Sequence, residues 1–195
     1  MSILNLTSET LVASPASGQI EYNGQFFGTD SNASRAQMQR ITQGTAVAST
    51  SGTSIDFTGL PAWVKRITVM FYGVSTNGTS FPRIQIGAGS IQSSGYLGVG
   101  VQFAVSSSAA LATGAGGFDI PSGAATAVLT GHSVLTNITG NTWVMSGFLA
   151  KTETAYGFSI GGNVVLSGTL DRVRITTVNG TDAYDAGSIN LLWEG

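Results

Sequence analysis

The chain has 195 residues, of which 42% are hydrophobic and only 9% are charged, and its formal net charge at pH 7 is -2. Globular proteins usually contain about 25% charged residues, so Ser, Thr, Asn and the 27 glycines must supply most of the polar surface. Because positive charge is scarce, we expect neither nucleic acid nor an anionic membrane as a partner. The chain has no cysteine, which excludes disulfides and thiolate metal sites.

The first five residues, MSILN, lack the basic region and the apolar run of a secretory signal. We therefore expect synthesis in a cytoplasm. The long uncharged stretch between Arg83 and Asp119 is interrupted throughout by Gly, Ser and Gln. These residues are costly in hydrocarbon, so no transmembrane span and no membrane insertion are predicted.

Residues 1–45 contain three aromatic side chains that the local sequence cannot bury. Tyr22, Phe26 and Phe27 lie around an Asn-Gly turn, among Ser, Thr and Gln. An isolated hairpin is marginally stable in water, so these rings need the rest of the chain or another copy to cover them. We predict a short extended oligomerisation arm over 1–45, with a flexible joint at Gln43–Ser51 and at most a helical turn or two at Asn32–Ile41.

Residues 46–195 have the pattern of antiparallel β-structure. In the strand predicted at Trp63–Tyr72, Lys65, Ile67, Val69 and Phe71 point one way and Arg66, Thr68, Met70 and Tyr72 point the other, as in a strand with one face in a core. Asp171–Val178 repeats this alternation, and further strands are predicted at Thr142–Leu149 and Asn163–Leu170. Asn-Gly turns separate many of these runs. The expected fold is an all-β, jelly-roll-like antiparallel β-sandwich head.

Three segments resemble bacteriophage tail-fibre and other virion fibre proteins. ASPASGQIEYNGQFFGTDSNASRAQMQRI (13–41) is similar to the part of such proteins in which the subunits interlock. SGTSIDFTGLPAWVKRITVMFYGVSTNGTS (51–80) and LSGTLDRVRITTVNGTDAYDAGSINLLWEG (166–195) resemble their β-rich C-terminal domain. The resemblance implies a homotrimer in the virion, in which neighbouring chains cover Tyr22, Phe26 and Phe27.

The resemblance implies a structural virion protein, a trimeric tail fibre or fibre-tip module that attaches to the host surface and contacts other proteins of the tail or the capsid. The chain has no extended repeat shaft before its head, so a capsid decoration or head-fibre protein remains an alternative, and a carbohydrate-binding lectin is a second. A glycan on the host cell surface is a further expected partner of the chain. Tyr96 and Phe118, set among Gly and Ser, are the candidate receptor or glycan contacts, because an exposed ring offers a flat apolar platform for a sugar.

The sequence gives no support for an enzyme or a cofactor. His132 is followed by Ser133, and adjacent strand residues point to opposite faces, so this pair does not predict a nucleophile and its base. Asp182 and Asp185 could bind a hard cation, although capping of a hairpin turn is the favoured interpretation. The glycines of 114–117 resemble a phosphate loop only in composition and are expected to form a surface loop.

Overall fold

The computed structural model describes residues 10–23, 25–104, 108–112 and 114–195. The chain divides into two compact units, Met1–Arg40 and Ile41–Gly195. Within the described residues every regular element is a β-strand and every strand pair is antiparallel, which confirms the all-β class. The helical turn considered at Asn32–Ile41 is wrong, because a strand occupies Arg35–Gln37.

The first unit is a three-stranded sheet in the order β1-β2-β3. Tyr22 is the register partner of Phe26, and their ring centroids are 5.0 Å apart. Of the described side chains in this unit, only Thr29 is buried, so this part of the chain has no hydrophobic core of its own. Its strands are β1 (Ile20–Tyr22), β2 (Phe26–Thr29) and β3 (Arg35–Gln37).

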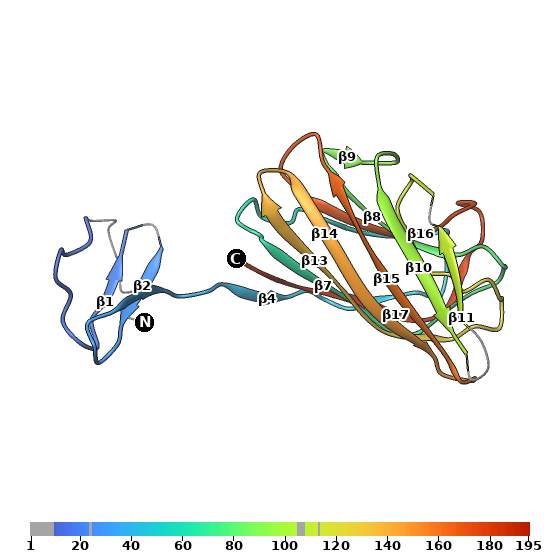
Figure 1. Cartoon of the computed structure of the whole chain (residues 1–195), viewed down its shortest axis with the longest axis horizontal. Helices are drawn as coiled ribbons and strands as arrows, with labels where there is room; N and C mark the ends of the chain where they lie inside the picture. Colours follow the sequence, from blue (N-terminus) through green and yellow to red (C-terminus); the bar gives the residue numbers. More distant parts are fainter. Residues whose placement is uncertain (1–9, 24, 105–107, 113) are drawn as a thin grey trace. The chain divides into compact units, whose positions relative to one another are not determined.

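The second unit is a β-sandwich of two antiparallel sheets (Figure 1). The larger, nine-stranded sheet has the order β11-β10-β15-β14-β13-β7-β17-β4, and β5 also pairs with β17. Its strands are β4 (Ile41–Gln43), β5 (Val47–Ala48), β7 (Arg66–Thr76), β10 (Leu97–Phe103), β11 (Ser108–Ala112), β13 (Leu129–Thr139), β14 (Thr142–Lys151), β15 (Tyr156–Val165) and β17 (Tyr184–Glu194).

The smaller, five-stranded sheet has the order β12-β8-β16-β6, and β9 pairs with β8. Its strands are β6 (Ser54–Thr58), β8 (Pro82–Ala88), β9 (Ser90–Ile91), β12 (Phe118–Asp119) and β16 (Arg172–Thr177). The hydrophobic core consists of the inward side chains of both sheets, for example Val69 and Leu135 from the larger and Ile84 and Ile175 from the smaller. A sandwich is therefore present, and the jelly-roll arrangement of its strands stays a prediction.

The alternation read from the sequence gives the correct inward faces of β7 and β16. Ile67, Val69 and Phe71 are buried, whereas Tyr72 is 75% exposed. Val173 and Ile175 are buried between the partly exposed side chains of their neighbours. These strands have one face on the core and one face turned outward, which is the condition under which a period of two is informative.

Two sequence-based boundaries are wrong. The segment expected to be a flexible joint, Gln43–Ser51, is bonded to β17: Gly44 N donates to Leu191 O at 2.7 Å, and Ser49 N donates to Gly187 O at 2.9 Å. The strand expected at Asn163–Leu170 ends at Val165 as part of β15. The division between the compact units accordingly lies N-terminal of the expected joint, between Arg40 and Ile41.

Candidate interaction surfaces

The outer face of the nine-stranded sheet exposes large apolar side chains. Tyr72 is 75% exposed, Leu97 67% and Phe148 55%. We call this surface the apolar face and define it by six exposed side chains: Tyr72, Leu97, Val99, Phe103, Phe148 and Val165.

Strand β10 contributes most to the apolar face, because its apolar side chains point away from the core. Gly100 pairs with the buried Ile160 and therefore faces inward, and a Cβ on Gly100 would lie 2.8 Å from Cδ of Pro121. The close approach of Pro121 leaves no room for a side chain at Gly100. The alternate residues Leu97, Val99 and Phe103 consequently lie on the outside.

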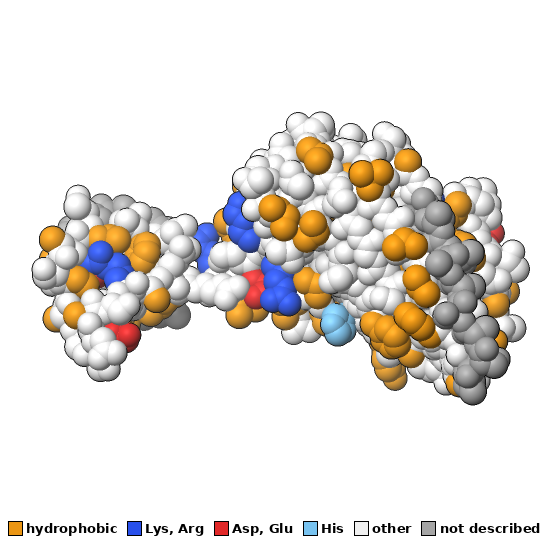
Figure 2. All heavy atoms as spheres, viewed as in Figure 1, with side chains coloured by type: hydrophobic (Ala, Val, Ile, Leu, Met, Phe, Trp, Pro, Cys, Tyr) orange, Lys and Arg blue, Asp and Glu red, His pale blue; other side chains and the backbone are white. Residues whose placement is uncertain are grey.

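The register of neighbouring strands shows that the apolar face is uncharged over most of its width. Phe148 lies opposite His132, and His132 lies opposite Met70. The ion pair between Arg66 and Glu194 (3.6 Å) lies at the end of the same face. Figure 2 shows hydrophobic and uncharged polar side chains across this face, with the charged side chains gathered mainly near one end of the sheet.

The outer face of the five-stranded sheet is charged and internally compensated. Arg83 lies opposite Asp119 and donates to it from Nε (2.5 Å) and Nη2 (3.0 Å). Arg174 lies opposite Asp56 and donates to it in the same bidentate manner, at 2.6 and 2.9 Å. The two sheets of the sandwich thus present outer faces of opposite character.

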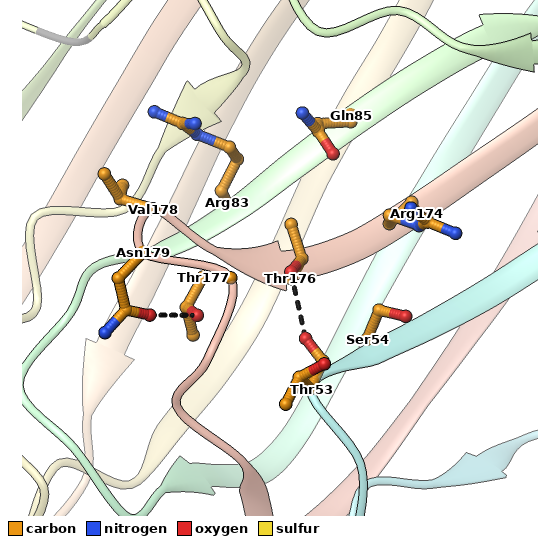
Figure 3. A pocket seen from close by; sticks show the side chains of 10 residues that line it. Thr53, Ser54, Arg83, Gln85, Arg174, Thr176, Thr177, Val178 and Asn179 are labelled. Carbon is orange, nitrogen blue, oxygen red and sulfur yellow. Dashed lines mark hydrogen bonds between the residues drawn. The ribbon is translucent and has the colours of Figure 1, made fainter.

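A pocket of about 300 Å³ lies on this charged face (Figure 3). Its lining is almost entirely polar and comes from β6, β8, β16 and the loop that follows β16. Figure 3 shows Thr176 in the middle of the pocket, with Gln85 on one side and Ser54 on the other. The lining residues are Thr53, Ser54, Arg83, Gln85, Arg174, Thr176, Thr177, Val178, Asn179 and Gly180.

Ionisable groups near this face are held by local hydrogen bonds. The guanidinium of Arg172 donates to Asp171 at 2.7 Å and lowers the pKa of that carboxyl below its usual value. Asp182 accepts from Asn179 Nδ2 at 2.7 Å and from Ser80 N at 2.8 Å, and these bonds lower its pKa. Asp182 therefore ties together the two loops that contain Ser80 and Asn179.

The predicted exposure of Tyr96 and Phe118 is wrong. Their side chains are 2% and 1% exposed, and the two rings meet edge to face with centroids 5.0 Å apart. The Tyr96 hydroxyl donates to Ile86 O and accepts from Ile86 N, and burial raises its pKa to about 12. Neither ring can serve as a platform for a receptor or a glycan, because both belong to the core.

His132 and Ser133 are separated by the strand that carries them. Exposed His132 and buried Ser133 point to opposite faces of β13. The hydrogen bonds of Asp182 match the turn-capping interpretation, and Asp185 accepts a bond from the Ser75 hydroxyl. In the first unit Phe26 is 45% exposed and Phe27 is partly buried; their predicted role at an interface between copies stays a prediction.

Within the described residues, no three or more His, Asp and Glu side chains lie close enough together to bind a metal ion. No helix in the described part of the chain has the length and hydrophobicity to cross a lipid bilayer.

Sequence reasoning missed both the apolar face and the pocket. The signal for the first is present in LGVGVQF (97–103), where large apolar residues alternate with Gly and Gln. The pattern shows that one face is apolar, but only the position of Pro121 shows that this face is the outer one. The pocket has no local signal, because its lining comes from three strands and adjoining loops that are distant in sequence.

No protein-family model matches the chain, and neither a curated protein nor a solved structure matches it.

Proposed function

We propose that the chain is a structural protein of a bacteriophage virion, a homotrimeric tail-fibre or fibre-tip module that attaches to the host surface. The observation that supports this most strongly is the orientation of β10, whose apolar side chains point outward while Gly100 faces inward. In a monomer the outward apolar side chains of β10 stay in contact with water, so their orientation does not stabilise the fold. In a protein whose copies pack together, the same side chains form an interface.

The apolar face is suited to another copy of the same chain. Exposed apolar side chains gathered on one face mark protein–protein contacts in soluble proteins, and a face that is uncharged over most of its width meets itself with little like-charge repulsion. Tyr72, Phe103 and Phe148 are about half to three-quarters exposed, and an aromatic side chain buries about 150–250 Å² when covered, so the three contribute roughly 350 Å². The aliphatic members add to this area, and a stable interface needs about 800 Å² from each partner.

The N-terminal unit supports the same proposal. Its described residues form no hydrophobic core. The rings of Tyr22 and Phe26 contact each other, but Phe26 stays 45% exposed. We propose that neighbouring copies cover the rings of Tyr22, Phe26 and Phe27. The number of copies, three, rests on the resemblance to virion fibres.

Two other functions fit the same surfaces. A capsid decoration or head-fibre protein would also assemble through the apolar face, but it would bind assembled capsids. A lectin would bind a defined sugar as an isolated protein, and it would not need the apolar face to be covered.

Light scattering on the full chain tests the proposal. We expect a mass three times the 19.9 kDa of one chain. Val99→Asp places a charge on the apolar face and should lower this mass. Thr58→Asp places the same charge at an exposed strand position of the other sheet and should leave it unchanged. A wild-type protein with the mass of a single chain would contradict the proposal and favour the lectin.

A further inference from the structure

The pocket on the outer face of the five-stranded sheet has a preformed arrangement of neutral hydrogen-bonding groups. Thr176 lies opposite both Arg83 and Ser54, which places its side chain between those of the two neighbouring strands. Its hydroxyl donates to Thr53 O at 2.9 Å. Gln85, on β8, is almost fully buried, and its amide nitrogen donates to Gly116 O at 2.6 Å.

These contacts fix the polar groups before any ligand arrives. The amide nitrogen of Gln85 is engaged by Gly116, and Figure 3 shows the amide oxygen turned toward the side of Thr176 and Arg174. At the other end of the pocket, the Thr177 hydroxyl donates to Asn179 Oδ1 at 2.9 Å. Groups that are already oriented lose little conformational freedom on binding, which favours recognition by hydrogen bonds.

The charges around the pocket cancel. The guanidinium groups of Arg83 and Arg174 point away from the middle of the pocket in Figure 3, and each is engaged by its own carboxylate, Asp119 and Asp56. An anionic ligand would gain no net attraction, and it would meet two carboxylates nearby. The groups left facing the middle of the pocket are hydroxyls and an amide, which are neutral and whose oxygens can accept hydrogen bonds.

We infer that this pocket binds one neutral sugar residue. The volume of about 300 Å³ is at the lower end of the range for small-molecule sites. The hydroxyls of Thr176 and Ser54 already donate to Thr53 O and to Asp56 Oδ2, so their oxygens and the amide oxygen of Gln85 are acceptors to which the hydroxyls of a neutral sugar can donate. None of the ten lining residues is aromatic, so the ligand is held by hydrogen bonds alone and each site is expected to bind weakly.

The inference rests on the proposed function only in assigning the sugar to a host surface. The pocket and the apolar face lie on the outer sides of different sheets, so packing through the apolar face leaves the pocket of each copy open. Several weak sites on one assembly then act together and raise the overall affinity.

The test titrates the full chain with glucose, galactose, rhamnose and N-acetylglucosamine, and with glucuronic acid as the charged match to glucose. Binding is followed by calorimetry and by saturation-transfer NMR. We expect at least one neutral sugar to bind saturably with a dissociation constant in the millimolar range, and glucuronic acid to bind more weakly than glucose.

Thr176→Val removes the central hydroxyl but keeps the shape and strand preference of the side chain, and should weaken binding roughly 3- to 10-fold. Thr176→Tyr fills the pocket and should abolish binding. Thr68→Val, on the outer face of the other sheet, is the matched control and should bind like the wild type. Thermal melting of each variant verifies that it is folded.

Three results would overturn the inference: no saturable binding of any neutral sugar, stronger binding of glucuronic acid than of glucose, or undiminished binding by a folded Thr176→Tyr variant. A chain that binds sugar but has the mass of a single copy would keep this inference and contradict the fibre proposal. An assembled chain that binds no neutral sugar would contradict this inference and keep the fibre proposal.

Discussion

The ring of Phe148 on β14 lies over Gly157 on β15, the neighbouring strand. A Cβ added to Gly157 would be 2.6 Å from Cζ of Phe148, closer than such atoms approach in proteins. The absence of a side chain at Gly157 therefore leaves the room that the end of this ring occupies. In the same strand Gly161 also faces outward, but its added Cβ would meet nothing closer than 3.5 Å, at Met145 O.

This difference predicts opposite outcomes for two similar substitutions. Gly157→Ala should displace the Phe148 ring and weaken association between copies, whereas Gly161→Ala should leave association intact. Alanine is favoured over glycine inside a strand by about 0.5–1 kcal/mol, so we expect Gly161→Ala to raise the free energy of unfolding slightly. Light scattering over a dilution series measures association, and equal dissociation constants for the two variants would contradict the proposed role of the Phe148 ring.

The two Arg–Asp pairs of the five-stranded sheet should differ in their contribution to stability. The Arg83–Asp119 pair is largely buried, so Asp119→Asn leaves the Arg83 charge uncompensated and should cost about 3 kcal/mol or more. The Arg174–Asp56 pair is more than one-third exposed, and Asp56→Asn should cost about 1 kcal/mol or less. Urea unfolding at one fixed protein concentration measures both, and a larger loss for Asp56→Asn would show that burial does not determine the ranking.

Tyr96→Phe should be destabilising because the hydroxyl bonds both polar groups of the Ile86 backbone. Without it, the Ile86 N–H loses this acceptor, whereas Ile86 O keeps the bond from Gln92 N at 3.1 Å, so we expect a cost of about 1–3 kcal/mol. Tyr156→Phe, at an exposed position outside the apolar face, is the control and should change stability by less than about 0.5 kcal/mol. Similar losses in the two variants would indicate that the Tyr96 hydroxyl is not held as described.

Tyr96 should also make the free energy of unfolding depend on pH. Burial raises the pKa of Tyr96 from 10.0 to about 12 in the folded chain. Because the folded-state value is the higher one, the contribution of Tyr96 to stability is complete below pH 10 and is lost as the pH rises through about 12. Urea unfolding between these pH values should show a smaller decline for Tyr96→Phe than for the wild type, and parallel declines would contradict this assignment.

The sequence predicted strands well where one face of a strand meets the core and the other does not. Ile67, Val69 and Phe71 follow this rule, so alternation identified both the strand and its inward face. Strand β10 is an exception, because the apolar residues of its alternation face outward instead of toward the core. Its apolar residues alternate regularly, but Gly100 lies against Pro121, a contact 21 positions away that no local pattern contains.

Tyr96 and Phe118 are buried although they lie in the glycine-rich middle of the chain. Their flanking glycines suggested an exposed loop, but a Cβ on Gly117 would lie 2.6 Å from Cγ of Arg83. Here glycine permits a close approach of the backbone to another strand, and that approach buries the two rings. Composition cannot distinguish a glycine that gives flexibility from one that makes room for packing.

Residues 41–50 bind the head through β4, β5 and the segment around them. A chain that begins at Ile41 keeps β4 and β5 paired with β17, whereas one that begins at Ser51 loses both. It also loses the hydrogen bonds of Gly44 with Leu191 and Asn190 and those of Ser49 with Ala186 and Gly187. Each such bond contributes about 0.5–1.5 kcal/mol, so we expect the shorter chain to be less stable by about 2–6 kcal/mol.

Urea unfolding of the two truncated chains measures this difference, and equal stabilities would show that residues 41–50 contribute nothing to the head. The chain that begins at Ile41 also separates the two proposed interfaces. If it still associates, and Val99→Asp prevents this, the apolar face holds the copies together without Tyr22, Phe26 and Phe27. If it is monomeric while the full chain is not, the N-terminal unit is required, and the apolar face alone is too weak to hold the assembly.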